Sequence, residues 1–203
     1  MDIAAAESAG LTPIDLARAF LSGGARFLQL RAKQLSGAAL LELAKAFVAS
    51  VRPYGGVAVI NDRADIAKLA GADGVHLGQD DLPPRAARAM LGPSALIGYS
   101  THTVAQIEAA AGEPVDYVAI GPVFGTTTKE TGYAAVGLDM VANAAKSRRP
   151  VVAIGGIRLD NAPSVIAAGA ASVAVIGDLL VTGDPAGRTA EFLAALRGAS
   201  RCG

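Results

Sequence analysis

The stretch AGADGVHL, residues 70–77, joins the end of a predicted helix to the start of a predicted strand. Gly71 supplies the left-handed residue that commonly follows a helix, and the apolar segment after it has the length and composition of a buried strand. The same order occurs in GGARFLQL, residues 23–30, and in AAGAASVAVI, residues 167–176. The chain therefore carries a weak internal repeat of one helix–strand unit.

Apolar, β-branched runs recur along the whole chain and predict seven strands, at residues 27–30, 57–60, 74–77, 96–99, 117–120, 151–154 and 172–176. Alanine-rich segments with helical periodicity lie between them. In the segment 37–51 one side is expected to carry Leu40, Leu41, Leu43, Ala44 and Phe47. Strands that alternate with helices predict an α/β fold with a parallel sheet. A spacing of about 25 residues per unit favours a (β/α)8 TIM barrel, with a flavodoxin-like open sheet as the alternative.

The beginning of the chain does not fit a complete barrel. Residues 1–7 are too short and too rich in alanine for a convincing first strand before the helix that should start near Pro13 or Ile14. The barrel therefore either lacks its first strand or keeps a vestige of it in MDIA, residues 1–4. No internal linker or low-complexity block divides the chain, so residues 1–203 are expected to form a single barrel domain.

Composition excludes several classes of partner. Lys and Arg number 18, as do Asp and Glu, so the formal charge is zero and no global field attracts nucleic acid or an acidic membrane. The single cysteine, Cys202, excludes a disulfide framework and a cysteine-based metal cluster. Without an apolar run of about 18 residues, a cytoplasmic protein with no membrane partner is expected.

Polar side chains gather where the predicted strands end, which is where parallel barrels place their functional groups. They comprise Gln29, Arg31 and Lys33; Asn61 and Asp62; Gln79, Asp80 and Asp81; Ser100; and Thr126, Thr127, Thr128 and Lys129. Cations and carboxylates alternate in this set, and an anionic ligand is the first interpretation. Two carboxylates from separate strand ends, without a histidine or cysteine ligand nearby, are the hard oxygen donors that Mg2+ prefers.

Local structural roles are the alternatives for these residues. Asn61 and Asp62 could form a turn and a helix N-cap, and Asp80 or Asp81 could cap the next helix. AIGGI, residues 153–157, and AVIG, residues 174–177, come after the last two strands, where barrels commonly bind phosphate through backbone N–H groups. A tight turn is the alternative there. His76 and His102 are interpreted as structural rather than catalytic.

Several of these segments together resemble the thiamine phosphate synthase (thiamine-phosphate pyrophosphorylase) family, from about residue 11 to residue 196. The matching pieces are QLRAK (29–33), INDR (60–63), DGVHLGQDD (73–81), GYSTHT (98–103), GPVFGTTTK (121–129) and AIGGI (153–157). Each is weak alone, but their order and spacing are specific. The resemblance implies a (β/α)8 barrel transferase that condenses 4-amino-2-methyl-5-hydroxymethylpyrimidine diphosphate with a thiazole phosphate. The products would be thiamine phosphate and pyrophosphate. The cofactor would be Mg2+.

The resemblance also implies roles by position. The pyrimidine diphosphate would be held by Gln29, Leu30, Arg31, Ala32, Lys33, Asn61, Ser100 and Lys129. The thiazole phosphate would be held by Thr126, Thr127, Thr128, Gly156, Ile176 and Gly177. Mg2+ would be bound by Asp62 and Asp81, which favours Asp81 over Asp80. The catalytic residues would be Arg31, Lys33 and Lys129, where catalysis means stabilisation of the leaving pyrophosphate.

Some positions depart from the family pattern. Ala32 stands where an acidic residue is usual, Gly125 where a proline is common, and Gly177 where a serine is usual. Two other functions remain open. A thiazole tautomerase shares the fold but is characterised by a histidine in the loop where this chain has GPVFG. The other is a barrel that binds a phosphorylated ligand without catalysis. In each case the partners are small phosphorylated molecules, and the oligomeric state is not indicated.

Overall fold

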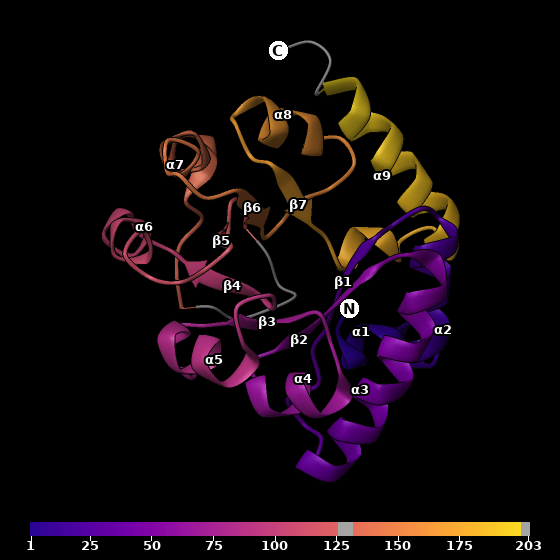
Figure 1. Cartoon of the computed structure of the whole chain (residues 1–203). Helices are drawn as coiled ribbons and strands as arrows, with labels where there is room; N and C mark the ends of the chain where they lie inside the picture. The colour runs from indigo at the N-terminus through magenta and orange to yellow at the C-terminus, as the bar shows by residue number, and fades with distance from the viewer. Residues whose placement is uncertain (126–131, 200–203) are drawn as a thin grey trace.

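The computed structural model describes residues 1–125 and 132–199. Seven parallel strands form one sheet in sequential order, and helices lie around the outside of the curled sheet (Figure 1). The strands are β1 Phe27–Leu30, β2 Val57–Asn61, β3 Gly74–Leu77, β4 Leu96–Thr101, β5 Tyr117–Ile120, β6 Val151–Ile154 and β7 Ser172–Ala174. The α/β barrel class and the positions of all seven predicted strands are thereby confirmed.

The helices fill the intervals between the strands. They are α1 Ile3–Ser8, α2 Pro13–Ser22, α3 Gly37–Val51, α4 Ala64–Ala70, α5 Pro84–Leu91, α6 Val104–Ala110, α7 Gly137–Ala144, α8 Ala162–Ala167 and α9 Pro185–Ala199, with short 3-10 turns η1 Arg52–Tyr54 and η2 Gly177–Leu179. The glycines of the repeated unit behave as predicted, since φ is +103° at Gly24, +66° at Gly71 and +101° at Gly169. In the described part of the chain, no helix is long and apolar enough to cross a membrane.

In the part of the chain that the structure describes, the sheet has two edges, β1 and β7, and only a trace of an eighth strand beside β1. Asp2 forms an isolated parallel bridge with Arg31, and the Arg31 N–H donates to the Met1 carbonyl at 2.9 Å. The backbone turns helical at Ile3. Of the two interpretations of MDIA, the vestigial strand is therefore correct.

The helix layer continues where the sheet is open. Helix α9 contacts both α8 and α2. A Cβ added at Gly23, which lies directly after α2, would lie 2.3 Å from the carbonyl oxygen of Ala186 in α9. Because a side chain there would collide with backbone, glycine permits the close approach of the two helices.

The buried face of α3 differs from the expected one. Leu41 and Leu43 are only partly buried, whereas Val48 and Val51 join Leu40, Ala44 and Phe47 in the core. This set follows the 3.6-residue period along the whole helix, which is why it extends further toward the C-terminus than the predicted stripe.

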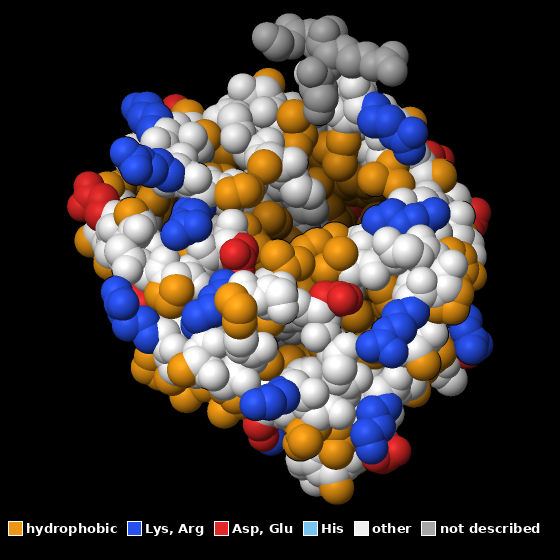
Figure 2. All heavy atoms as spheres, in the orientation of Figure 1, with side chains coloured by type: hydrophobic (Ala, Val, Ile, Leu, Met, Phe, Trp, Pro, Cys, Tyr) orange, Lys and Arg blue, Asp and Glu red, His pale blue; other side chains and the backbone are white. Residues whose placement is uncertain are grey.

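Side chains on the strands alternate between the helices and the barrel interior. On β1, Leu28 and Leu30 are buried in the core, whereas Phe27 and Gln29 are more accessible. Register then relates the interior positions, because paired residues of parallel strands point the same way. Asn61 pairs with His76, His76 with Gly98, and Gly98 with Tyr117. Figure 2 shows a hollow at the centre of one face, lined by hydrophobic side chains, with acidic and basic side chains at its edge.

Candidate active site

Asp62 lies directly after β2 in an unusual backbone conformation. Its φ is +64°, the only positive value at a non-glycine residue that the structure describes. Asp and Asn tolerate this left-handed region better than other side chains do. The Asp62 N–H donates to the His76 carbonyl at 2.7 Å, and Lys33 Nζ lies 3.0 Å from Asp62 Oδ2. Neighbouring strand ends thus hold this carboxylate against a lysine.

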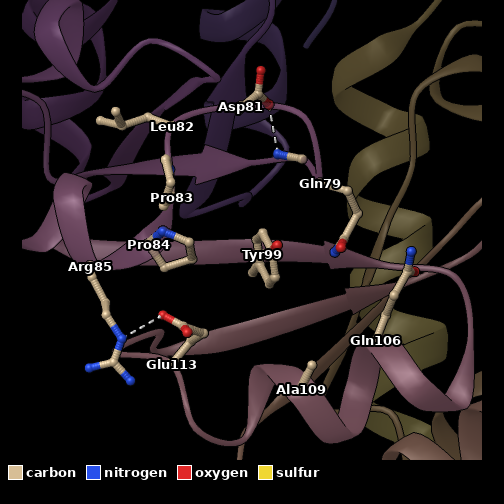
Figure 3. Close-up of a pocket in the computed structure, with 11 residues that line it drawn as sticks. Gln79, Asp81, Leu82, Pro83, Pro84, Arg85, Tyr99, Gln106, Ala109 and Glu113 are labelled. Carbon is tan, nitrogen blue, oxygen red and sulfur yellow. Dashed lines mark hydrogen bonds and ion pairs between the residues drawn. The ribbon is translucent and has the colours of Figure 1, made fainter.

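Asp81 comes after β3 and lies next to Asp62. Its Oδ2 accepts a hydrogen bond of 2.7 Å from the Gly78 N–H (Figure 3). Burial raises the pKa of Asp81, and the neighbouring Asp62 carboxyl raises it further, against the opposing effects of Gly78 and Lys33. Two acidic groups held this close disfavour their shared ionisation unless a cation balances them.

The capping roles considered for the aspartates are not found. The N-cap of α4 is Arg63 and that of α5 is Pro83, and neither makes a side-chain capping hydrogen bond. Asp80 is exposed, whereas Asp81 is half-buried and engaged with Gly78. The structure brings together one aspartate from each strand end, and Asp81 is the member that turns toward Asp62.

Arg31 has a partner that sequence reasoning missed. One of its terminal nitrogens forms an ion pair with the Asp2 carboxylate. Its Nε is buried and has no hydrogen-bond partner among the residues that the structure describes. Asp2 precedes Arg31 by 29 positions, and no local pattern links the two. A buried N–H without an acceptor is costly, so this donor is available to a ligand oxygen.

The other residues of the segment 29–33 differ in orientation. Leu30 is 1% exposed and belongs to the core, and Ala32 packs against that core. Only the backbone of Leu30 could therefore reach a ligand, a limit that its place in QLRAK does not reveal. Lys33, in contrast, is exposed apart from its contact with Asp62.

Ser100 lies on β4 with its polar atoms engaged. Its Oγ is 2.9 Å from His76 Nε2, and its carbonyl accepts a hydrogen bond of 2.6 Å from the Gln79 side chain. Asn61, at the end of β2, is half-buried and pairs in register with His76 of β3. The described residues that were predicted to hold the pyrimidine thus come from β1, β2 and β4, with β3 between the last two.

The glycine pair after β6 packs against the loop that comes after β5. Gly156 has φ +64°, and a Cβ there would lie 2.5 Å from the Gly125 carbonyl oxygen. Only glycine therefore satisfies both the backbone angle and the close contact. The next turn is held by Asn161, whose side chain accepts from the Arg158 N–H at 2.8 Å and donates to the Gly156 carbonyl at 3.1 Å.

Asp178 ties this turn to the next strand end. Its Oδ2 accepts from the Leu159 N–H at 3.1 Å and from the Arg188 guanidinium at 2.7 Å, and its side chain is 8% exposed. It lies in η2, directly after Ile176 and Gly177. One buried carboxylate therefore positions both glycine-bearing loops and anchors them to α9.

Replacing Asp178 by alanine should loosen both loops. We expect the KM for an anionic ligand held there to rise about tenfold, the size of a lost charge-assisted hydrogen bond. Steady-state kinetics with that substrate varied would measure the change. Asp160→Ala is the matched control, because the Asp160 side chain is 77% exposed in the same turn. Equal KM values in the two variants would contradict the anchoring role of Asp178.

Four of the predicted site residues fall in the segment between the two described ranges. Thr126, Thr127, Thr128 and Lys129 lie outside the described residues. Their expected roles therefore stay predictions.

Comparison with known proteins identifies the family. The family model described as thiamine monophosphate synthase matches residues 3–179. The chain belongs to the thiamine monophosphate synthase family.

Curated relatives agree with this family. The thiamine-phosphate synthase of Chlorobium luteolum is 42% identical over 193 residues, covering 95% of this chain and 91% of the relative. That of Koribacter versatilis is 47% identical over 178 residues, covering 87% of this chain and 83% of the relative. Both relatives are named for the synthase reaction, which is the activity expected of this chain.

Solved structures agree as well. A thiamine phosphate pyrophosphorylase from Pyrococcus furiosus superposes with a TM-score of 0.84 at 31% identity, covering 92% of this chain and 90% of the other. Phosphoribosyl anthranilate isomerase from Thermotoga maritima, at 16% identity and a TM-score of 0.68, shares the fold alone.

A cavity of about 270 Å3 adjoins the strand-end site, and Gly78, Gln79 and Asp81 belong to its lining. It is lined by α5, α6 and Tyr99 of β4, whose side chain lies in the middle of the group (Figure 3). The ion pair of Arg85 with Glu113 lies at its far end from Asp81. Tyr99 neighbours the inward-facing Ser100 and so points outward, which separates this cavity from the barrel interior.

Proposed function

We propose that this member of the thiamine monophosphate synthase family joins hydroxymethylpyrimidine diphosphate to a thiazole phosphate, with release of pyrophosphate. The observation that carries the proposal is the cluster of Asp62, Asp81 and Lys33 at adjacent strand ends. Such a cluster suits a diphosphate and a divalent cation together. The glycine loops near Gly156 and Gly177 suit a second, singly phosphorylated substrate.

The residues present fit Mg2+. Asp62 and Asp81 offer hard oxygen ligands side by side. Burial and the neighbouring Asp62 carboxyl raise the pKa of Asp81, and a bound cation would favour the ionised form again. Within the described residues, no group of three or more His, Cys, Asp or Glu is arranged for a metal, so water and substrate phosphate would complete the set. Bound there, Mg2+ would neutralise negative charge on the diphosphate.

Cationic side chains would stabilise the leaving pyrophosphate. Breaking the bond between the pyrimidine methylene and the diphosphate oxygen leaves a cation on the amino-substituted ring and a polyanion beside it. In this proposal Lys33, Arg31 and Lys129 face the growing negative charge. Arg31 would contribute its buried Nε, which has no partner in the described part of the chain. No side-chain nucleophile is needed, because the thiazole nitrogen captures the cation.

The pyrimidine and thiazole substrates would meet across the mouth of the barrel. Gln29, Asn61 and Ser100 would hold the pyrimidine diphosphate together with the backbone of Leu30 and Ala32. The thiazole phosphate would lie against Thr126, Thr127, Thr128, Gly156, Ile176 and Gly177. Fixing both substrates in one site makes the capture step effectively unimolecular. Because Gly177 has no hydroxyl, backbone N–H groups alone would serve at that position.

The two rival functions are less well supported. The tautomerase is characterised by a histidine where this chain has GPVFG, and Pro122 occupies that loop. The relatives above are named for the synthase reaction, and Asp62 and Asp81 lie together as a diphosphate-binding cation site requires. A non-catalytic binding barrel would bind the same ligands without turnover.

The test is pyrophosphate release from the purified chain with both substrates, in Mg2+ or in EDTA, with thiamine phosphate identified as the product. Turnover in Mg2+ and none in EDTA would support the proposal. Binding of both substrates without product would favour the non-catalytic barrel, and conversion of a thiazole isomer alone would favour the tautomerase.

Asp81→Asn should separate stability from metal binding. The raised pKa of Asp81 means that the folded state favours the protonated carboxyl, so the free energy of unfolding falls as pH rises from the ordinary value for Asp through the raised value. At pH 7 in EDTA the neutral asparagine should therefore raise Tm. It keeps an acceptor for the Gly78 N–H.

Adding Mg2+ should then reverse the order, raising Tm of the unmodified chain by several degrees and that of the variant hardly at all. Thermal melts at pH 7 with and without Mg2+ measure both effects. The idea would be wrong if the variant melted lower in EDTA and gained as much from Mg2+ as the unmodified chain.

A further inference from the structure

Three polar side chains form a continuous hydrogen-bonded chain inside the barrel. Tyr117 Oη of β5 lies 2.9 Å from His76 Nδ1 of β3, and His76 Nε2 lies 2.9 Å from Ser100 Oγ of β4. His76 is 7% exposed and Tyr117 is 8% exposed, whereas Ser100 is half-buried. The two ring nitrogens of one buried imidazole thus connect the barrel interior to a residue proposed to hold substrate.

Strand β4 leaves space for these hydrogen-bonded side chains. It runs between β3 and β5, and Gly98 is the residue in register with both His76 and Tyr117. A Cβ at Gly98 would lie 2.1 Å from Tyr117 Cζ and 2.4 Å from His76 Nδ1. Any side chain there would prevent the contact. Polar groups are costly in a barrel interior unless they are paired, so the three residues and the glycine form one built arrangement.

The direction of each hydrogen bond depends on the phenol. Burial raises the pKa of Tyr117 further above neutrality, so the hydroxyl keeps its proton. Its partner among the described residues is His76 Nδ1, and a buried O–H that did not donate there would be left without an acceptor. Nδ1 is therefore the acceptor, and the neutral imidazole carries its proton on Nε2. The Nε2–H then donates to Ser100 Oγ.

The Ser100 hydroxyl is left with a defined role. Because its oxygen already accepts from Nε2–H, its own proton is free to be donated, and the Gln79 side chain holds the backbone carbonyl of the same residue at 2.6 Å. We propose that His76 is a positioning residue that, with Tyr117, presents the Ser100 hydroxyl as a hydrogen-bond donor to an acceptor atom of the pyrimidine diphosphate. This inference rests on the proposed function and adds His76 and Tyr117 to the substrate-holding machinery.

The kinetic test compares His76→Ala, His76→Gln, Tyr117→Phe and Ser100→Ala. His76→Ala should raise the KM for the pyrimidine diphosphate about five- to tenfold and leave the KM for the thiazole phosphate unchanged, the size of one lost hydrogen bond. His76→Gln keeps an N–H donor and should recover part of the loss. Combining His76→Ala with Ser100→Ala should be no worse than Ser100→Ala alone, because both changes remove the same interaction.

Tyr117→Phe is the gentlest variant and has a matched control. Removing the phenol should raise the same KM about two- to fivefold, because Nδ1 loses the donor that keeps the imidazole proton on Nε2. Tyr99→Phe should change neither KM, since the Tyr99 side chain points to the face of β4 opposite that of Ser100. Equal rises in both KM values in the His76 variants, or additive losses in the double variant, would overturn the positioning role.

Nitrogen-15 NMR of the histidine rings tests the arrangement without reference to turnover. The unmodified chain should show His76 as the neutral tautomer with the proton on Nε2, and Tyr117→Phe should shift it toward a mixture. A proton on Nδ1 in the unmodified chain would overturn the inference. If the unmodified chain made no thiamine phosphate, the proposed function would fail by itself, and the tautomer would still decide the arrangement of His76.

Discussion

Asp62→Asn is expected to lower turnover by about 10²-fold or more, the scale seen when one preorganised electrostatic group is removed from a site. Asparagine has the same shape and tolerates the left-handed backbone at this position, where φ is +64°. It cannot supply the charge that balances Lys33, whose Nζ lies 3.0 Å from Asp62 Oδ2. The loss should therefore come from charge and cation binding, not from a displaced strand end.

The measurement is kcat and the concentration of Mg2+ needed for half-maximal rate. Asp62→Asn should lower the first and raise the second, with a far-ultraviolet circular dichroism spectrum unchanged from that of the unmodified chain. Asp80→Asn is the matched control, since Asp80 is an exposed carboxylate next to Asp81 and should tolerate the change. A fully active Asp62→Asn variant, or an equal loss in Asp80→Asn, would remove Asp62 from the proposed cation site.

Arg88→Ala is expected to produce the largest loss of stability among the substitutions considered. Arg88 in α5 donates to the carbonyls of Ala95 and Pro114 and to Asp116 Oδ2, the last at 2.6 Å. The same carboxylate oxygen accepts from the Ile97 N–H at 2.7 Å. The arginine thus ties together the segments that lead into β4 and β5, at the end of the sheet opposite the proposed site.

Removing Arg88 leaves these acceptors without their donor. The Arg88 side chain is 20% exposed and that of Asp116 is 37% exposed, so solvent would compensate in part. We expect the free energy of unfolding to fall by about 2 to 3 kcal/mol, below the cost of breaking a fully buried ion pair. Urea denaturation would measure it, and kcat per folded molecule should stay unchanged.

Arg85→Ala is the control on the same helix. Its side chain is 71% exposed and lies 3.4 Å from Glu113, a geometry in which ion pairs contribute about 1 kcal/mol or less. Similar losses for Arg85→Ala and Arg88→Ala would show that α5 responds to any truncation, and the specific role of Arg88 would then be wrong.

Much of the fold could be predicted because its signals are local. Glycines such as Gly71 mark helix ends through their own backbone angles, and strands buried on both faces appear as short apolar runs. The predicted segment 96–99 is the first part of β4, Leu96–Thr101, and the observed strand continues through Ser100, a residue proposed to hold substrate. The buried side of α3 was predicted less well, since Leu41 and Leu43 are apolar but only partly buried.

The candidate site could be located but not assembled. The polar residues after each strand place Lys33, Asp62 and Asp81 at one end of the barrel, because parallel strands all end on the same side. The same reasoning interpreted His76 as structural, since a histidine inside an apolar strand has no local feature that indicates its partners. The contact of His76 with Tyr117 is possible only because Gly98, on the strand between them, has no side chain to fill that space. Its contact with Ser100 likewise joins residues of two different strands.

The sequence by itself determined the order of helices and strands, the family, and the end of the barrel at which polar groups collect. Hydrophobic periodicity and glycine positions reflect preferences of a few consecutive residues, so they can be recognised without knowledge of the tertiary contacts. Only the tertiary structure decided that Arg31 pairs with Asp2, that Asp81 lies against Asp62, and that His76 connects Tyr117 to Ser100. These partners lie far apart along the chain, and their distances depend on the register and curl of the sheet.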